Sequence, residues 1–469
     1  MEVAVKEFRR DVQSALLRWS TSPSRRPLVL RGARQVGKTH VLRMLGQGHY
    51  RSCAYVNLFD VSAKSALSGA GSAQILLDSV EAYTGVRVRE DETLLIIDEI
   101  QEIPALLTML KSFKEQLPRI HIAAAGSYLG LAQHEGTSFP VGAVETMVMR
   151  PMSFLEFLDA TGDDVLARHI EDLDFGFLEG FADRLDRRVR QYCYVGGMPA
   201  AVDAFLNDGY QAARDIQTGL LSDYDMDFSK HPQAGGDVER VRLAFASIPT
   251  HLARENHKFV FGHIAKGARS VQYESAIQKI VDSGLATRVF KVTKPALPLR
   301  AYQDLSAFKL YMHDVGLLAA AMAVEPADLI LADTALTEFR GALTEQYVCQ
   351  QLVSEGVDPS YWATDNSSGG VDFIFRHGGA VIPLEVKAGV ERQAKSLRWL
   401  CGKFGLRGYR TSLRGYREQD WMTNVPLWAV GAFFRSRPQD GRELSGDDLA
   451  PLGQAGGRVD ESESEVKST

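Results

Sequence analysis

The stretch PLVLRGARQVGKTHVLRMLG, from Pro27 to Gly46, decides the fold of the first part of the chain. Its apolar start, PLVL, predicts a short buried strand, and its end, HVLRMLG, predicts a helix. Between them, GARQVGKT (Gly32–Thr39) carries the pattern G-x-x-x-x-G-K-[ST]. The strand before it and the helix after it favour a phosphate-binding loop over a chance match in a glycine-containing turn.

This loop and the start of the helix predict a nucleotide site. The two glycines let the backbone wrap closely around a phosphate, and the amides at the helix N-terminus point toward the anion. Lys38 is expected to reach the β- and γ-phosphates, and the Thr39 hydroxyl to bind Mg²⁺. ATP and Mg²⁺ are therefore the expected cofactors. The predicted nucleotide-binding residues are Gly32, Ala33, Arg34, Gln35, Val36, Gly37, Lys38, Thr39 and His40.

A second motif, LLIIDEIQ (Leu94–Gln101), ends an apolar run with two acids, Asp98 and Glu99. An acid at a strand end beside a phosphate-binding loop can hold magnesium. The next acid can act as a base toward the attacking water. Asp98 is therefore a predicted metal ligand together with Thr39, and Glu99 is the predicted catalytic base. The alternative is an exposed acidic turn, which the loop upstream makes less favourable.

The third motif, AAAGSYLG (Ala123–Gly130), places Ser127 at the end of another apolar run. Its hydroxyl is a candidate sensor of the γ-phosphate, and a helix N-cap is an equally good interpretation. The sequence identifies no arginine finger. Arg150, Arg184 and Arg187 are the candidates, although most surface arginines are simply solvated.

Short apolar segments alternate with helical patterns through the first 160 residues. Besides PLVL, the predicted strands are AYVNL (Ala54–Leu58), TLLIID (Thr93–Asp98) and IHIAAAG (Ile120–Gly126). Brief apolar strands separated by helices are typical of a parallel sheet that is covered on both faces. Residues 1–160 are therefore expected to form a doubly wound α/β domain. The family resemblance given below implies that this domain is the core of a P-loop ATPase of AAA+ type.

The composition sets outer limits on what the chain can be. With 469 residues it predicts about two to four domains. Its net charge of -6 gives no overall basic character that would point to nucleic acid. Four widely separated cysteines form no pair at metal-binding spacing and fit a reduced, cytoplasmic compartment. No segment is long and apolar enough to predict a membrane span.

The middle of the chain is expected to be largely helical. Residues 161–235 are charged and helical, and predict a lid or linker region. Residues 236–330 include the order helix, turn, helix, followed by LATRVFKV (Leu285–Val292) as a strand. This order resembles a winged helix, which could place the helix SVQYESAIQKIV (Ser270–Val281) against DNA. The alternative is a packing module between two domains.

The segment GGVDFIFRHGGAVIPLEVKAG (Gly369–Gly389) predicts a hairpin that turns at the double glycine 378–379. In that register Asp372 lies directly opposite Glu385, and Lys387 shares their face. The opposite face carries Val371, Phe373, Phe375, Ile382, Leu384 and Val386. Two opposed carboxylates repel each other unless a cation such as Mg²⁺ lies between them. The alternative is a solvated, charged face on an edge strand.

These residues resemble the D…ExK signature of the PD-(D/E)XK, or restriction-endonuclease-like, fold. The resemblance implies a restriction-endonuclease-like α/β domain over residues 331–436. It also implies that Asp372 and Glu385 are metal ligands and that Lys387 is catalytic. Glu345, in LTEQYV, would be a supporting acid, and Gln393 is a further candidate. After Pro438 the chain is rich in Gly, Asp, Glu and Ser, so residues 437–469 predict a disordered tail.

From Phe8 to about Phe434 the chain is similar to a large prokaryotic family that joins an AAA+ type P-loop ATPase to a C-terminal domain of unknown function with this nuclease-like fold. The matching motifs, in chain order, are DEIQ, AGSYLG, RPMSFLEFL, GGMP and HDVGLLAA.

Two hypotheses of function follow. The first is an ATPase that acts on DNA in an ATP-gated manner, with a metal-dependent nuclease at its C-terminal end. The second is a nucleotide-dependent switch whose nuclease-like domain is inactive and binds a partner. A transport or signalling ATPase is a weaker third hypothesis. A partner subunit or another protein partner is also expected, because no arginine finger is evident within the chain.

Overall fold

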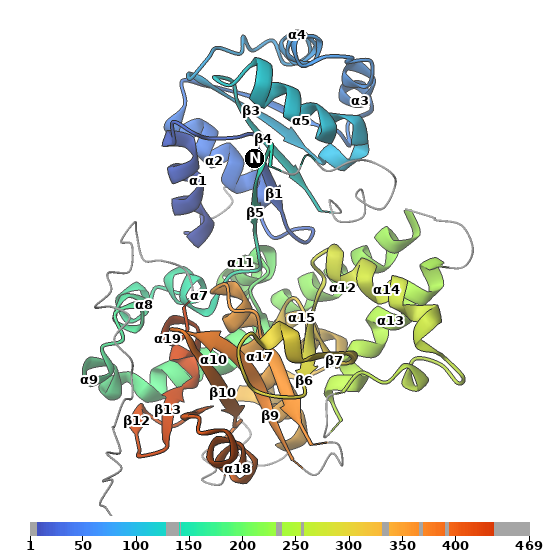
Figure 1. Ribbon diagram of the computed structural model, residues 1–469. Helices are drawn as coiled ribbons and strands as arrows, with labels where there is room; N and C mark the ends of the chain where they lie inside the picture. Colours follow the sequence, from blue (N-terminus) through green and yellow to red (C-terminus); the bar gives the residue numbers. More distant parts are fainter. Residues whose placement is uncertain are drawn as a thin grey trace, which may run out of the picture.

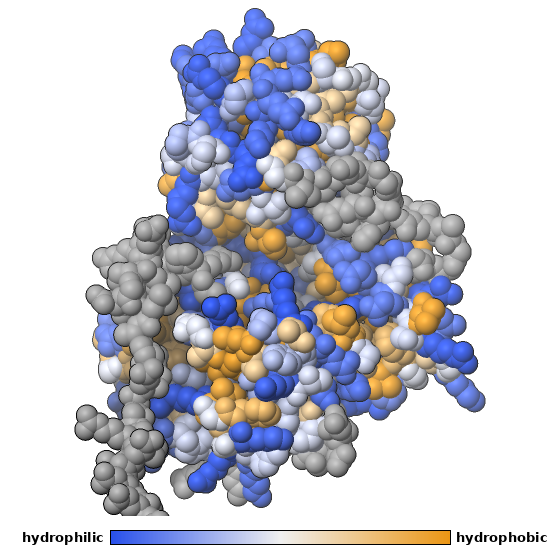
Figure 2. Space-filling model, viewed as in Figure 1, coloured by the Kyte–Doolittle hydropathy of each residue, from blue (hydrophilic) through white to orange (hydrophobic). Residues whose placement is uncertain are grey.

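A computed structural model describes residues 7–127, 140, 142–230, 237–254, 258–330, 337–364, 369–389 and 394–435. The predicted tail and Gln393 lie outside these ranges. Figures 1 and 2 show a smaller N-terminal mass joined to a larger one at a narrower waist. None of the described helices is long and apolar enough to cross a membrane.

The N-terminal mass is built on a five-stranded parallel sheet, in the order β2-β3-β4-β1-β5. The prediction of a parallel sheet is confirmed. TLLIID forms a strand over the predicted residues, whereas β5 was not predicted. The strands are β1 (Leu28–Arg31), β2 (Ser52–Asn57), β3 (Thr93–Asp98), β4 (His121–Gly126) and β5 (Glu145–Val148).

Helices cover both faces of this sheet (Figure 1). Successive residues of β1 alternate between two cores, with Leu28 and Leu30 in one and Val29 in the other. Strands buried on both faces need apolar residues at every position, which explains their unbroken apolar sequence. Helices α1 (Asp11–Thr21) and α2 (Lys38–His49) contribute to the first core. Helices α3 (Val61–Ser68), α4 (Ala73–Thr84) and α5 (Pro104–Gln116) contribute to the second.

A run of helices follows, as predicted for the middle of the chain. Buried apolar residues such as Leu185 and Val189 of α10 tie this run to the same core as the first face of the sheet. The helices are α7 (Phe154–Ala160), α8 (Asp164–Glu171), α9 (Phe175–Leu178), α10 (Ala182–Val195), α11 (Pro199–Asp208), α12 (Tyr210–Lys230), α13 (Asp237–Leu252) and α14 (Ser270–Asp282).

The second sheet has eight strands in the order β12-β13-β11-β10-β9-β8-β6-β7. Strand β6 (Ala286–Val292) covers most of the predicted strand LATRVFKV and pairs antiparallel with β7 (Gln303–Met312). However, β6 also pairs with β8 (Ser360–Ala363). The strand pair of the middle segment therefore extends the C-terminal sheet instead of standing alone, and the expected boundary near residue 330 falls inside one sheet.

The rest of this sheet and its helices complete the C-terminal part. The strands are β9 (Gly370–His377), β10 (Ala380–Val386), β11 (Gly408–Ser412), β12 (Arg417–Glu418) and β13 (Met422–Pro426). The helices are α15 (Val315–Ala321), α16 (Pro326–Ile330), α17 (Thr337–Ser354), α18 (Lys395–Phe404) and α19 (Val430–Phe433). Apolar residues of α17 and α18 are buried in different cores, so the two helices cover opposite faces of the hairpin.

The hairpin β9–β10 has the predicted turn and register. His377 pairs with Ala380, and the pairing continues to Phe373 and Leu384. Both glycines of the turn have positive φ, 54° and 79°. Such angles strain other residues, which is why a double glycine predicts this turn so well.

The predicted faces of the hairpin are wrong at Val371. Ser360 of β8 pairs with Ile374, whereas Trp362 pairs with Val371, so β9 holds one residue more than β8 over this interval. This bulge turns Val371 into the core that contains Ile374, whereas Phe373 packs in the main core. Both faces of the hairpin therefore carry buried apolar residues, so the face with Asp372 is not a solvated charged face.

Candidate functional site

The phosphate-binding loop packs tightly in the waist of the molecule. A Cβ atom on Gly32 would lie 2.2 Å from the Met149 backbone oxygen, so only glycine fits there. Gly37 has a φ of 99°, which favours glycine, and it leads directly into α2. The two glycines of the motif thus have separate steric reasons, a close contact and a left-handed turn.

Lys38 is buried and turned back onto its own loop. Its Nζ donates hydrogen bonds to the backbone oxygens of Gly32 at 2.9 Å and Ala33 at 2.8 Å. It also lies 3.4 Å from the Ser127 Oγ. Burial lowers the pKa of Lys38 to about 8, although the nearby charges of Glu99 and Asp98 act in the opposite direction. The ammonium group is therefore held where an anion would stabilise its charge.

Thr39, near the start of α2, is hydrogen-bonded to Asp98, at the end of β3. Thr39 Oγ1 donates to Asp98 Oδ2 at 2.5 Å, and the Tyr55 hydroxyl donates to the same oxygen at 3.1 Å. Burial raises the pKa of Tyr55, which keeps its hydroxyl protonated as a donor. Tyr55 was missed by the sequence interpretation. Its position near the end of β2 could have predicted it, because β2 pairs in parallel with β3, the strand that ends at Asp98.

Glu99 follows Asp98 in a left-handed backbone conformation, with a φ of 53°. Burial raises the pKa of Glu99, whereas the hydrogen bond from Gln101 and the charge of Lys38 lower it. Gln101 Nε2 donates to Glu99 Oε2 at 2.5 Å. Glu99 is thus close to Lys38 and Asp98, as a base in a phosphate site must be.

These residues fit Mg·ATP. The loop offers a buried cation and the N-terminus of a twelve-residue helix to the phosphates. Thr39 and Asp98 are the residues that would hold Mg²⁺, which when bound neutralises charge on the β- and γ-phosphates. His40 lies on α2, and its Nε2 is buried without a hydrogen-bond partner among the described residues. Among the described residues, no contact places His40 in the phosphate site.

The structure places the three candidate arginines in different environments. Arg184 forms an ion pair with Asp163 in the helical segment. Arg187 lies exposed on α10. Arg150 lines a small cavity of about 40 Å³ that also touches Gly32 and Ala33. The structure therefore brings Arg150 near the loop, whereas Arg184 is held in a separate ion pair.

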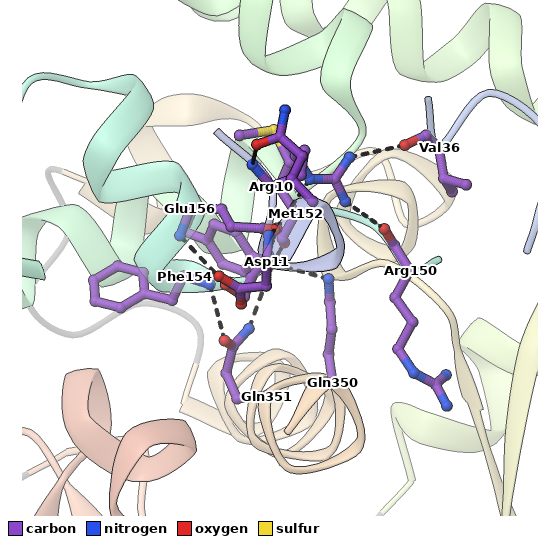
Figure 3. A network of polar contacts seen from close by, with 12 residues as sticks. Arg10, Asp11, Val36, Arg150, Met152, Phe154, Glu156, Gln350 and Gln351 are labelled. Carbon is purple, nitrogen blue, oxygen red and sulfur yellow. Dashed lines mark hydrogen bonds and ion pairs between the residues drawn. The ribbon is translucent and has the colours of Figure 1, made fainter. Parts of the chain in front are cut away.

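A polar network joins the loop to the C-terminal part (Figure 3). Arg10 donates to the Val36 oxygen at 2.9 Å and to the Arg150 oxygen at 2.6 Å. Farther along, Gln351 of α17 accepts a hydrogen bond from the Phe154 backbone at 2.9 Å. Helix α17 also carries Glu345, so it connects both predicted sites.

Glu345 lies in a buried charge cluster. Its Oε1 is 2.6 Å from the Nζ of Lys309 on β7 and also accepts a hydrogen bond from Tyr311. Lys309 and Glu345 are 5% and 4% exposed. The sequence interpretation missed Lys309, which comes from a strand expected to belong to another domain. Glu345 therefore already has a cation as its partner.

Asp372 and Glu385 are close but are bonded differently. Asp372 Oδ2 accepts a hydrogen bond from the Val386 backbone at 2.8 Å. Burial raises the pKa of Asp372 to about 6, and the charges of Glu345 and Glu385 act in the same direction. Glu385 forms an ion pair with Lys387 at 2.9 Å, while its Oε2 is buried without a hydrogen-bond partner among the described residues.

The described residues contain no group of three or more His, Cys, Asp or Glu side chains arranged to hold a metal ion. Asp372, Glu385 and Glu345 thus do not form a complete ligand set by themselves. Mg²⁺ often keeps several waters and binds through one or two carboxylates. The Glu385 oxygen that lacks a hydrogen-bond partner, together with Asp372, fits such a two-carboxylate site, whereas Glu345 already pairs with Lys309.

Comparisons with known proteins find matches to three parts of the chain. Residues 24–158 match a family model described as an AAA domain. Residues 186–328 and 340–430 match models of two domains of unknown function, DUF8612 and DUF4143. The chain therefore contains an AAA-type P-loop ATPase domain. No curated protein matches the sequence.

Solved structures are similar only at a coarse level. The Walker-type ATPase PABY2304 of Pyrococcus abyssi is 13% identical, with a TM-score of 0.42, over 67% of this chain and 96% of that chain. The Aeropyrum pernix Orc1 protein, solved in complex with DNA, is 14% identical, with a TM-score of 0.28, over 68% and 94%. Cdc6p from Pyrobaculum aerophilum is 12% identical, with a TM-score of 0.26, over 70% and 97%.

Proposed function

We propose that this protein hydrolyses ATP with Mg²⁺ and uses the cycle to control action on DNA by its C-terminal part. The observation that carries the ATPase proposal is the meeting of Lys38 and Thr39, at the start of α2, with Asp98, at the end of β3. Loop glycines alone could form an ordinary turn, whereas a buried lysine on the loop and a Thr–Asp pair beside it match the needs of a triphosphate.

All four cysteines are free, consistent with a cytoplasmic location.

The reaction assigns one task to each residue. Lys38 and the loop amides bind the phosphates, and Tyr55 positions Asp98. A water oxygen bonds to the γ-phosphorus while the bond to the bridging oxygen of ADP breaks, which yields ADP and inorganic phosphate. The water proton passes to Glu99, which must be ionised to accept it.

Steady-state ATP hydrolysis tests this proposal with the full chain. Asp98→Asn is expected to lower kcat by about a hundredfold or more, because it removes the anionic partner of the metal site. Asp78→Asn, on the exposed face of α4, is the matched control and is expected to retain wild-type turnover. Wild-type turnover in Asp98→Asn would exclude this site as the ATPase centre.

A basic segment supports the DNA part of the proposal. Residues 395–417 contain seven Lys and Arg residues and no Asp or Glu, in a chain with a net charge of -6. Lys395, Arg398 and Lys403 lie on the exposed face of α18, and Trp399 beside them is 50% exposed. Cations with an exposed aromatic ring suit contact with phosphates and bases.

Fluorescence anisotropy with labelled single-stranded and duplex DNA tests this contact in EDTA, where no cleavage occurs. Arg398→Ala with Lys403→Ala is expected to weaken binding and to reduce the salt dependence by about 1.4 in the log–log slope for a single strand. Lys111→Ala on α5 is the control, because Lys111 is also exposed but lies on the N-terminal mass. Equal binding by all forms would refute the α18 contact.

Metal-dependent cleavage of DNA is a second candidate, favoured by the orphaned Glu385 oxygen beside Asp372. Asp372 and Glu385 would hold a divalent cation, which when bound supplies positive charge to a phosphate and its attacking water. Lys387 would stabilise developing negative charge. With Mn²⁺, wild-type protein is expected to cut plasmid, linear or single-stranded DNA, and Lys387→Ala to lose this activity.

The alternative, an inactive nuclease-like domain that binds a partner, is favoured by the Lys309–Glu345 pair. Thermal unfolding with and without Mn²⁺ separates the two. A cation at the hairpin predicts that Mn²⁺ stabilises the wild type more than Asp372→Ala. Asp98→Asn is added to both proteins, because it removes the metal-binding carboxylate of the ATP site. Equal stabilisation would favour the inactive domain.

A further inference from the structure

We infer that Arg34 is a further catalytic residue, which supplies a second cation to the γ-phosphate from within the same chain, and that Asp227 of α12 holds it when no triphosphate is present. The inference rests on the proposed ATPase function and names a residue for it. It also removes the expectation that an arginine must come from a partner subunit.

Arg34 belongs to the loop itself. It directly follows Ala33, whose backbone oxygen accepts the hydrogen bond from Lys38 Nζ at 2.8 Å. Its positive charge lowers the pKa of both Lys38 and Glu99. The guanidinium therefore shares one electrostatic environment with the predicted phosphate-binding lysine and the predicted base.

Helix α12 lies against this loop and presents acids to it. Arg34 Nη1 forms an ion pair with Asp227 Oδ2. Four residues earlier on the helix, Asp223 Oδ2 accepts a hydrogen bond from Gln35 Nε2 at 3.0 Å. Between them, the Tyr224 hydroxyl donates to the Arg34 backbone oxygen at 3.0 Å. One turn of α12 thus contacts successive loop residues through both side chains and backbone.

The two side chains of this ion pair differ in exposure, which would allow Arg34 to exchange Asp227 for another anion. Asp227 is 3% exposed, whereas the Arg34 side chain is 29% exposed and lies with its Cζ 5.8 Å from the ring centre of Phe59. A long side chain at the solvent edge can move, whereas a buried carboxylate on a long helix cannot. A triphosphate carries more negative charge than one carboxylate, so it competes for the guanidinium, and a planar guanidinium suits phosphate oxygens.

The chemistry makes a second cation useful. As the bond from the γ-phosphorus to the bridging oxygen breaks, negative charge on the phosphate oxygens needs stabilisation. Lys38 is one cation, and Arg34 would be the other. Arg34 belongs to the phosphate-binding loop, whereas Arg184 lies on α10 and pairs with Asp163 in the helical segment.

The experiment separates binding from turnover and controls for folding. Arg34→Ala alone would leave Asp227 buried without its cation, so the main variant is Arg34→Ala with Asp227→Asn. We expect this double variant to bind ADP within about twofold of wild type. We expect it to bind the slowly hydrolysed analogue ATPγS about tenfold more weakly, since one charge-assisted contact is lost. Its kcat should fall by about a hundredfold or more.

Asp227→Asn is the complementary variant, because it keeps Arg34 but weakens its holding partner. It is expected to bind ATPγS more tightly than wild type while binding ADP equally. Arg34→Lys is expected to recover binding of ATPγS but only part of kcat, because an ammonium lacks the planar fork of donors.

Three results would overturn the inference. An unchanged ratio of ATPγS to ADP affinity in the double variant would show that Arg34 does not contact the γ-phosphate. An equal loss of both affinities would show a structural role in the loop. Wild-type kcat in the double variant would exclude a catalytic role. Because the affinity ratio needs no turnover, it tests Arg34 even if wild-type protein hydrolyses no ATP, which would instead refute the proposed ATPase.

Discussion

The phosphate-binding loop and the C-terminal hairpin were both predicted as charged sites, yet they differ in how their charges are balanced. At the loop, Lys38 is bonded to neutral backbone oxygens and lies near two acids, Asp98 and Glu99. At the hairpin, Glu345 has Lys309 and Glu385 has Lys387 as close ionic partners. The first site is arranged for an incoming anion, whereas the second is largely neutralised from within.

Clustered charges indicate function only when the partners of each charge are known. A buried ion pair needs its partner to offset the loss of hydration and is by itself weak support for a catalytic role. A buried group without such a partner points more strongly to a ligand. By this criterion the nucleotide site is strong, and within the described part of the hairpin the Glu385 Oε2 atom qualifies.

The largest expected effect comes from removing the loop cation. Lys38→Ala should lower ATP turnover by about a thousandfold, because it removes the buried charge that faces the phosphates. Steady-state phosphate release measures this effect, and Lys111→Ala on α5 serves as the exposed control. Retention of wild-type turnover would mean that the loop is not the catalytic phosphate site. The contrast drawn between the loop and the hairpin would then be wrong.

Removing the base should have the next largest effect. Glu99→Gln is expected to lower kcat by about a hundredfold while ATP binding is kept. Because burial raises the pKa of Glu99, activity should fall with decreasing pH at values above the usual range for glutamate. Gln101→Ala removes a hydrogen bond that lowers this pKa, so it should move the acidic limb of the kcat–pH profile to higher pH. A limb that stays in place would show that another group titrates.

Breaking the internal neutralisation of the C-terminal part should cost stability instead of ATPase activity. Lys309→Met leaves Glu345 buried without its cation and is expected to destabilise the protein by about 3–5 kcal/mol. Urea unfolding measures the loss. Lys309→Met with Glu345→Leu should recover most of it, because no uncompensated charge remains. If Lys309→Met is as stable as wild type, the Lys309–Glu345 pair does not neutralise the hairpin site, and the contrast with the loop is wrong.

The smallest effect concerns His313, which lines the same cavity as Gly32 and whose Nε2 lies 3.3 Å from the Tyr224 hydroxyl. Burial lowers the pKa of His313 to about 4. An unfolded histidine titrates near 6.5, so the unfolded state gains the proton first as the pH falls. This contribution to stability is complete above about pH 6.5 and declines by about 3 kcal/mol toward pH 4. His313→Gln, which does not titrate, should flatten that part of the stability–pH curve.

A curve that is equally steep in His313→Gln would assign the acid sensitivity to other groups. Asp186 cannot be the source of this acid sensitivity, because burial raises the pKa of Asp186 to about 7. Protonation of Asp186 favours the folded state, so it makes the protein more stable as the pH falls. The two groups therefore act in opposite directions and can be distinguished.

Much of the fold followed from local sequence patterns. The strand that ends at Asp98 and the turn at residues 378–379 were predicted correctly, because periodicity and glycine content act over a few neighbouring residues. The extension of the C-terminal sheet by β6 and β7 was not predicted, since pairing of β6 with β8 joins segments far apart in the chain. The bulge at Val371 was not predicted either, and a shift of one residue reverses the direction of the following side chains.

The sequence by itself determined the phosphate-binding loop, because the residues that wrap a phosphate are contiguous and their backbone demands are local. It also determined which acids end a strand beside that loop. Only the tertiary structure decided which charges are partnered. Lys309 reaches Glu345 and Asp227 reaches Arg34 from distant parts of the chain, and the energy of a buried charge depends on such neighbours and not on its position in the sequence.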